Sequence, residues 1–309
     1  MLSVERVAGG VSTVVHRVRR HGETFYLRFG EEPGDDLRTD AALHDRLLAA
    51  GVPVPQFLHV RWDAGVQRSV GLTTEVPGEP LSRLQDAPSV LAAAGHFLRI
   101  VNSFPVDGFG FVRRDGPGWP LRGEFATHAE FVRSWLPDPW PGRLSALFPP
   151  SELAVLARLV EEQAALDVPA RLVHGDFDTT PVFCVGPRFT GFIDFGEVRG
   201  AEPWFDLAHF LLHEGERIPA PLLPHLLRGY GQAPEPTVLV RSAVLLGLRQ
   251  LCRWYGPLRN WPAEHPAVVD RVRRLRELLP SEPSGPGHRG PSGRGTGVGT
   301  SPSRRPGSG

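Results

Sequence analysis

The pattern of apolar residues changes at the Pro77–Gly78 pair, and this change limits the folds open to the chain. Before it, VSTVVHRV (11–18) and TFYLRF (24–29) alternate apolar and polar residues, and RRHGE between them is typical of a hairpin turn. Leu and Ala recur at helical spacing in residues 35–51, and VGLTTEVPGEPL (70–81) predicts a further strand. The first 78 residues are therefore expected to be rich in antiparallel strands, and Pro77–Gly78 to form a hinge.

The segment beyond this hinge is predicted to be mainly helical. Two short strand-like segments, RLVHGD (171–176) and RFTGFIDFG (188–196), interrupt its helices. The sequence thus predicts an α+β protein with a β-rich part at 1–78 and a mainly helical part at 79–280. Residues 281–309 consist almost entirely of Ser, Pro, Gly and Arg, a composition that predicts a disordered tail. The helical patterns lie at 89–101, 152–166, 204–214, 221–230, 238–255 and 267–279.

Composition excludes several classes of function. The 309 residues carry 34 basic and 34 acidic side chains, so nothing indicates a nucleic-acid surface or a basic membrane anchor. Every basic residue counted there is arginine. The N-terminal MLSVERVAGG lacks a basic segment followed by an apolar run, and the two cysteines are too few for a disulfide framework. We expect a soluble cytoplasmic protein, and the sequence implies no partner protein.

Two aspartates stand at the ends of the short strand-like segments. Asp176 follows the apolar RLV, whereas Asp194 ends the apolar run FTGFI just before a glycine. A phosphoryl-transfer site needs a carboxylate near the nucleophile, a carboxylate on the metal and a cation on the nucleotide phosphates. The chain offers all three. The alternative is that each aspartate only caps a turn.

These features together resemble one family. The chain resembles the aminoglycoside phosphotransferase family in its β-rich first part, its Pro-Gly hinge and its helical second part. It also shares the segments HGDFDTTPVF and FIDFGEVRGAEPWFDLAHF, in which the Asp of IDFG comes eighteen residues after the Asp of HGD. The resemblance covers about residues 4–280. It implies a bilobal, protein-kinase-like fold, with a nucleotide-binding lobe at 1–78 and a catalytic, acceptor-binding lobe at 79–280. It also implies ATP and Mg²⁺ as cofactors and a small-molecule hydroxyl as the acceptor.

The resemblance assigns roles to individual residues. It makes Asp176 the group that orients or deprotonates the acceptor hydroxyl and Asp194 the magnesium ligand. Asp206, in the D-L-A segment, is expected to brace the catalytic loop. We expect His174 to support the same loop through ring hydrogen bonds rather than to transfer protons.

The nucleotide-binding residues are expected in the first part. The loop GGVSTVV, with Gly9, Gly10 and Ser12, matches the family's glycine-containing strand turn, although a plain hairpin turn would have the same sequence. Arg28 occupies the place of the kinase strand lysine, and Asp40 that of the helix acid. Arginine is longer than the usual lysine and aspartate is shorter than the usual glutamate, so an Arg28–Asp40 pair would span the same distance as a lysine–glutamate pair. The alternative is a solvated arginine and an aspartate that favours the helix dipole.

Pro181 departs from the family pattern. It stands five residues after Asp176, where the resemblance implies an asparagine with a second magnesium contact, and proline has no side-chain donor or acceptor. Asp178 and the hydroxyls of Thr179 and Thr180 are candidate replacement ligands, and the alternative is that they only form an ordinary turn. Two functions remain open: an ATP-dependent small-molecule kinase, and a catalytically silent kinase-like protein that binds nucleotide or ligand. A protein kinase is disfavoured, because the HRD-type loop and the segment ending in APE are absent from the sequence.

Overall fold

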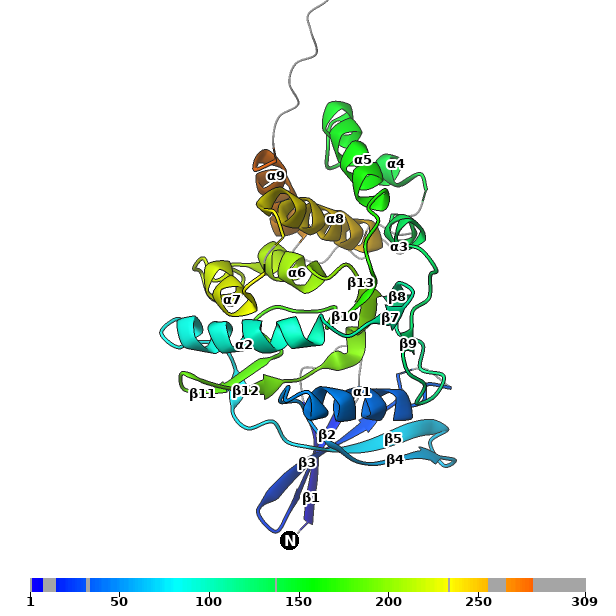
Figure 1. The fold of residues 1–309 in the computed structure, drawn as a ribbon, viewed down its shortest axis with the longest axis vertical. Helices are drawn as coiled ribbons and strands as arrows, with labels where there is room; N and C mark the ends of the chain where they lie inside the picture. Colours follow the sequence, from blue (N-terminus) through cyan, green and yellow to red (C-terminus); the bar gives the residue numbers. More distant parts are fainter. Residues whose placement is uncertain are drawn as a thin grey trace, which may run out of the picture. The chain divides into compact units, whose positions relative to one another are not determined.

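The computed structural model describes residues 2–7, 15–31, 34–136, 138–232, 234–254 and 265–279. The predicted glycine loop with Gly9, Gly10 and Ser12 and the predicted tail at 281–309 lie outside these residues. The described helices and strands belong to a single unit, Met1–Leu279. Figure 1 shows its strand-rich beginning at one end and its later helices at the other.

A five-stranded antiparallel sheet forms the first part. Its order is β1-β2-β3-β5-β4. The predicted hairpin is confirmed, because β2 and β3 pair from Val15↔Arg28 to Arg20↔Glu23 around a two-residue turn. His21 and Gly22 have φ values of 52° and 86° there, the left-handed conformation that a type I′ turn requires. The strands are β1 Leu2–Arg6, β2 Val15–Arg20, β3 Glu23–Phe29, β4 Phe57–Asp63 and β5 Arg68–Thr74.

Helix α1, Arg38–Ala49, is the helix predicted at 35–51. Its buried Leu43 and Leu47 lie in the core with Val52 and Val54, so the apolar stripe of the sequence is the packed face. The helix ends before Gly51, whose φ of +83° is the left-handed conformation common after a helix C-terminus. Figure 1 shows α1 between the sheet and the later helices.

Three small sheets lie in the second part. One has the order β12-β11-β6, a second β10-β13-β8, and the third is a parallel pair of β7 and β9. The two short strands predicted around RLV and RFTGF are confirmed as β10 and β12, whereas their partners were not predicted. The strands are β6 Glu79–Pro80, β7 Val106–Asp107, β8 Gly110–Phe111, β9 Leu121–Arg122, β10 Arg171–Val173, β11 Val182–Val185, β12 Arg188–Phe192 and β13 Arg199–Ala201.

Helix α2 is central to the second part. It packs against α7 so closely that a Cβ at Gly95 or Gly229 would clash with the backbone of the opposite helix. The six predicted helices are found as α2 and α5–α9. No helix among the described residues is long and apolar enough to span a membrane. The helices are α2 Ala87–Val101, α3 His128–Ser134, α4 Trp140–Arg143, α5 Pro150–Ala164, α6 Phe205–His213, α7 Leu223–Tyr230, α8 Pro236–Trp254 and α9 His265–Glu277, with a 3₁₀ turn η1 at Phe195–Glu197.

Candidate active site

The loop between β10 and β11 is held by a buried carboxylate. The Oδ2 atom of Asp206 accepts the backbone N–H of His174 at 2.9 Å, and Oδ1 accepts that of Gly175 at 2.9 Å. Asp206 is 0% exposed, and Asn102 Nδ2 donates to its Oδ2 at 3.0 Å. Gly175 has a φ of +90°, and a Cβ there would clash with the Glu197 carbonyl. The loop can therefore lie this close to the backbone of Glu197 only because the second residue of HGD is glycine.

Asn102 connects this carboxylate to the helices behind it. It follows α2, and its Nδ2 also donates to the Leu172 carbonyl of β10 at 3.0 Å. The Tyr230 hydroxyl of α7 lies 3.1 Å from Asn102 Oδ1 and 3.0 Å from the Pro203 carbonyl. Burial, and then the nearby charge of Asp206, raise the pKa of Tyr230, so the phenol stays protonated and can donate. Close packing of α2 against α7 thus fixes the position of Asp206.

His174 ties the same loop to the segment that contains Asp194. Its Nε2–H donates to the Ile193 carbonyl at 2.8 Å, and its ring lies 4.8 Å from that of Phe195. The Ile193 N–H in turn donates to the Pro181 carbonyl at 3.1 Å. Asp194 follows directly, in the left-handed conformation with φ 63° and ψ 59°. The HGD and IDFG segments are therefore joined by two hydrogen bonds that meet at one residue.

Asp176 lies at the wall of a cavity of about 230 Å³ between this loop, α6 and α8. Its side chain is 63% exposed, and Oδ1 lies 3.4 Å from Nε2 of His209. Nδ1 of His209 lies 3.1 Å from the Phe177 carbonyl and carries the hydrogen of that bond. Burial lowers the pKa of His209 well below 6.5, so this ring is neutral at pH 7. Partial burial removes water from the Asp176 carboxylate and raises its pKa above the ordinary value of 3.8.

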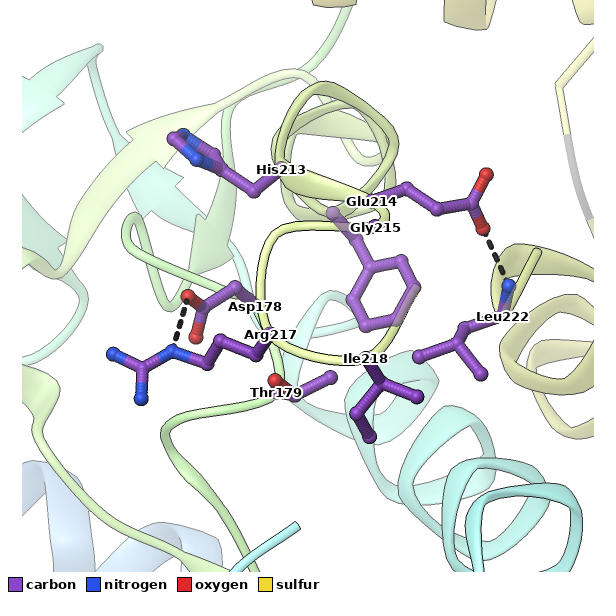
Figure 2. Close-up of a pocket in the computed structure, with 9 residues that line it drawn as sticks. Asp178, Thr179, His213, Glu214, Gly215, Arg217, Ile218 and Leu222 are labelled. Carbon is purple, nitrogen blue, oxygen red and sulfur yellow. Dashed lines mark hydrogen bonds and ion pairs between the residues drawn. The ribbon is translucent and has the colours of Figure 1, made fainter. Parts of the chain in front are cut away.

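Asp178 faces a different, smaller pocket. Figure 2 shows its carboxylate turned toward Arg217, whose Nε lies 3.8 Å from Oδ2. Oδ1 accepts the backbone N–H of Thr180 at 2.5 Å, a local turn of the kind that Asp commonly forms. Glu214, across this pocket in Figure 2, accepts the backbone N–H groups of Leu222 and Leu223 at 2.6 Å each. In the structure Asp178 is therefore engaged in turn and ion-pair contacts.

The predicted pairing of Arg28 with Asp40 is wrong. No described residue forms such a pair with Arg28. Asp40 is instead paired with Arg114, whose Nε lies 3.1 Å from Oδ2, and the two side chains are only 7% and 17% exposed. Arg114 also donates to the Gly196 carbonyl at 3.0 Å.

The cause lies in the segment after β8, which docks on the beginning of α1. There the Asp36 N–H donates to the Arg114 carbonyl at 3.1 Å, and Thr39 Oγ1 donates to the Gly116 carbonyl at 2.7 Å. This brings the guanidinium of Arg114 beside Asp40, a contact between residues 74 positions apart that no local pattern could indicate. The helix acid is thus linked to the segment after Asp194 through Arg114.

The surroundings of Asp194 indicate what it could bind. A Cβ at Gly196 would lie 3.5 Å from Asp194 Oδ1 and 3.4 Å from Glu31 Oε1, so these two carboxylates face the same small space. Among the described residues, no three His, Cys, Asp or Glu side chains converge on one point. Mg²⁺ is commonly held by one or two carboxylates together with substrate phosphates and waters. These residues would fit a magnesium ion only if nucleotide phosphates and waters supplied most of its ligands.

Residues 3–239 match the phosphotransferase enzyme family. The chain belongs to this family. A search of curated proteins finds no match.

Solved structures show that this phosphotransferase family member has the kinase-like, bilobal α+β fold. One is a thermostable mutant of aminoglycoside phosphotransferase APH(4)-Ia in ternary complex with AMP-PNP and hygromycin B. It has a TM-score of 0.70 and 18% identity, over 89% of this chain and 94% of that one. The GDP complex of aminoglycoside 2'-phosphotransferase-IIIa has a TM-score of 0.63 and 16% identity, over 89% and 92% of the two chains. At such identities the likeness concerns the fold.

Several residues at this family member's site were missed from the sequence. Arg114 and Asn102 come from connecting segments without a motif, and their partners are 74 and 104 residues away. Arg249 and Arg253 on α8 line the same cavity as Asp176. Their spacing of four residues, which places both on one face of the helix, was the available signal.

Proposed function

We propose that this protein is an ATP-dependent phosphotransferase that acts on a hydroxyl group of a small molecule. The observation that carries the proposal is the Asp206 carboxylate, which accepts the backbone N–H groups of both His174 and Gly175. With the His174 side chain on Ile193, this arrangement sets Asp176 and Asp194 at the ends of two connected segments. Phosphoryl transfer depends mainly on such positioning.

Asp176 is proposed as the general base. Its carboxylate faces a cavity in which a hydroxyl compound could lie, and its pKa is raised above its ordinary value of 3.8 toward neutral pH. A base whose pKa lies nearer the working pH is the more effective one. In this mechanism Asp176 accepts a hydrogen bond from the acceptor hydroxyl, orients its oxygen toward the γ-phosphorus and takes its proton.

Asp194 is the proposed magnesium ligand, and the nucleotide is proposed to bind to the part at 1–78. A bound Mg²⁺ would neutralise phosphate charge. Arg28 on β3 is proposed to bind the nucleotide phosphates, and Asp40 to act through Arg114 on the backbone of the Asp194 segment. Gly9, Gly10 and Ser12 are proposed to approach the phosphates through their backbone N–H groups. His174 and Asp206 would hold the loop in place.

The setting that we propose is the cytoplasm, because Cys184 and Cys252 are buried free thiols, which fit a reducing compartment. The acceptor is proposed to be a small molecule. The APH(4)-Ia structure contains hygromycin B, and a structure of APH(2")-IIia is a complex with GDP and kanamycin.

One observation favours a second candidate, a catalytically silent nucleotide-binding protein. Pro181 contributes only its carbonyl, which the Ile193 N–H already uses, and so has no side-chain ligand for a metal. Melting temperature and γ-phosphate release, measured with ATP in the absence and presence of Mg²⁺, distinguish the enzyme from the silent binding protein. At a hundred times the dissociation constant, ATP would add roughly 2.7 kcal/mol to the free energy of unfolding and raise the melting temperature by several degrees.

No melting shift at millimolar ATP with Mg²⁺ would exclude both candidates. A shift without loss of the γ-phosphate, to any acceptor or to water, would favour the silent binding protein. A shift with γ-phosphate transfer would establish the enzyme.

A further inference from the structure

The cavity next to Asp176 contains more positive than negative charge that is available to a ligand. Arg249 and Arg253 of α8 both line it, one helical turn apart. Among the described residues, neither guanidinium has a hydrogen-bond acceptor or a carboxylate within ion-pair distance. The Cζ atom of Arg249 lies 5.1 Å from the centroid of the Trp135 ring, a cation–π contact that takes up none of the guanidinium N–H groups as hydrogen-bond donors to a carboxylate.

The other titratable groups of the cavity are already neutral or paired. The Glu197 carboxylate accepts a hydrogen bond from Arg199 Nη2 at 2.5 Å, and Arg199 is 1% exposed. His213 lies 2.8 Å from Glu216, and His209 is neutral at pH 7. The charges left for a ligand are therefore two arginines and the carboxylate of Asp176, which the reaction needs for the acceptor hydroxyl.

Arg249 is also poorly solvated. Burial, and then the nearby charge of Arg199, lower the pKa of Arg249 to about 9. The charges of Glu197 and Asp176 oppose this shift only in part, and neither carboxylate is hydrogen-bonded to Arg249. A carboxylate that binds in the plane of the guanidinium would supply the missing hydrogen bonds. The same site would repel a ligand with several ammonium groups.

We propose that the phosphoryl acceptor is a small hydroxy acid whose carboxylate binds Arg249 and Arg253 while its hydroxyl faces Asp176. This assignment rests on the proposed function of the same site. It places polycationic aminoglycosides outside the substrate range, in contrast to the antibiotics bound by the solved relatives. Arg249 and Arg253 are specificity-determining residues in this account, because they bind the acceptor without touching the transferred phosphoryl group.

The test compares acids with alcohols of matched carbon chain. Glycerate and glycerol, lactate and propane-1,2-diol, and gluconate and sorbitol are offered to the full-length protein loaded with Mg²⁺ and the ATP analogue AMP-PNP. Binding is measured by calorimetry, and phosphoryl transfer is then measured with ATP. At least one acid is expected to bind 10-fold or more tightly than its neutral partner and to be phosphorylated. If no acid binds better than its partner, or if hygromycin B or kanamycin is phosphorylated, the proposal is wrong.

Variants of Arg249 and Arg253 test whether these two side chains bind the carboxylate of the acid. Arg249→Gln is expected to raise the KM of the preferred acid by about 10- to 100-fold, which corresponds to loss of a charge-assisted hydrogen bond, and to raise the KM of ATP much less. Arg249→Lys is expected to recover part of the loss, and the exposed Arg253→Gln to give a smaller loss. Arg61→Gln on β4, also exposed and paired with Asp63, removes the same charge elsewhere and is expected to change neither KM. Equal KM values for the acid in wild type and both glutamine variants would overturn the assignment.

Measurements with ATP distinguish a failure of the proposed function from a failure of the acceptor assignment. If ATP with Mg²⁺ neither raises the melting temperature nor loses its γ-phosphate, the proposed function fails. If ATP binds and turns over but acids have no advantage, only the acceptor assignment fails.

Discussion

Replacement of Asp206 by asparagine tests how the loop between β10 and β11 is held. The carboxylate is 0% exposed and accepts three hydrogen bonds, from the backbone N–H groups of His174 and Gly175 and from Nδ2 of Asn102. An asparagine offers one oxygen and one –NH₂ group, so at least one backbone N–H would face a donor instead of an acceptor. The amide of Asn102 cannot compensate by turning over, because its Oδ1 and Nδ2 already contact Tyr230 and the Leu172 carbonyl.

The magnitude follows from these three bonds. Hydrogen bonds to a charged group contribute about 1.5–3 kcal/mol each, and a buried donor left without an acceptor costs about 1–3 kcal/mol. We expect Asp206→Asn to lower the free energy of unfolding by about 2–4 kcal/mol, and Asp206→Ala to lower it further. The assay is equilibrium urea unfolding followed by tryptophan fluorescence. Asp45→Asn, at an exposed position of α1, is the matched control and should stay within about 0.5 kcal/mol of wild type.

The reasoning is refuted if Asp206→Asn unfolds like the Asp45→Asn control. Such a result would mean that the N–H groups of the loop find other acceptors easily, and that the buried carboxylate does not determine the position of Asp176. A loss of activity without a loss of stability would instead indicate a direct chemical role for Asp206.

The remaining predictions concern the metal and the response to acid. Asp194→Ala should weaken the Mg²⁺ dependence of ATP binding more than metal-free ATP binding, whereas equal losses in a titration would indicate a structural aspartate. Pro181→Asn should lower the Mg²⁺ concentration needed for half-maximal ATP binding relative to Pro181→Ala, and identical titrations would contradict a missing ligand. His44 is 1% exposed, and burial lowers its pKa from 6.5 to about 4. Because the unfolded chain takes up this proton first, stability that is complete above pH 6.5 should fall by roughly 3 kcal/mol as the pH drops to 4. A urea series should show a smaller fall for His44→Gln, and an unchanged slope would exclude His44 as the cause.

The strand and helix patterns of the sequence anticipated the main elements because they depend on local spacing. The β2–β3 hairpin could be predicted from alternation and from the turn residues His21 and Gly22. Strands such as β13, with only Arg199–Ala201, are too short for a period to appear in the sequence. They form because tertiary contacts place their backbone beside a partner strand.

The motifs of the sequence predict site residues, and their roles stay predictions. Asp176, Asp194 and Asp206 stand in recognisable segments, and in the structure the HGD and IDFG segments are joined by hydrogen bonds at Ile193. The partner of Asp40 could not be predicted, because Arg114 reaches it through a loop that docks on α1. The charge of the cavity next to Asp176 could not be predicted from the sequence either, since it depends on which arginines lack a hydrogen-bonded partner after folding.

The most direct test of the account is the rate at which the γ-phosphoryl group leaves radiolabelled ATP in wild type and in Asp176→Asn, both saturated with ATP and Mg²⁺. We predict that the variant retains the ATP-induced melting shift and melts no lower than wild type at pH 7, because a raised pKa means that the ionised carboxylate is disfavoured in the folded protein. Its rate should fall by about 10²–10⁴, the usual contribution of a general base. An Asp176→Asn variant that transfers phosphoryl groups at the wild-type rate would contradict the account.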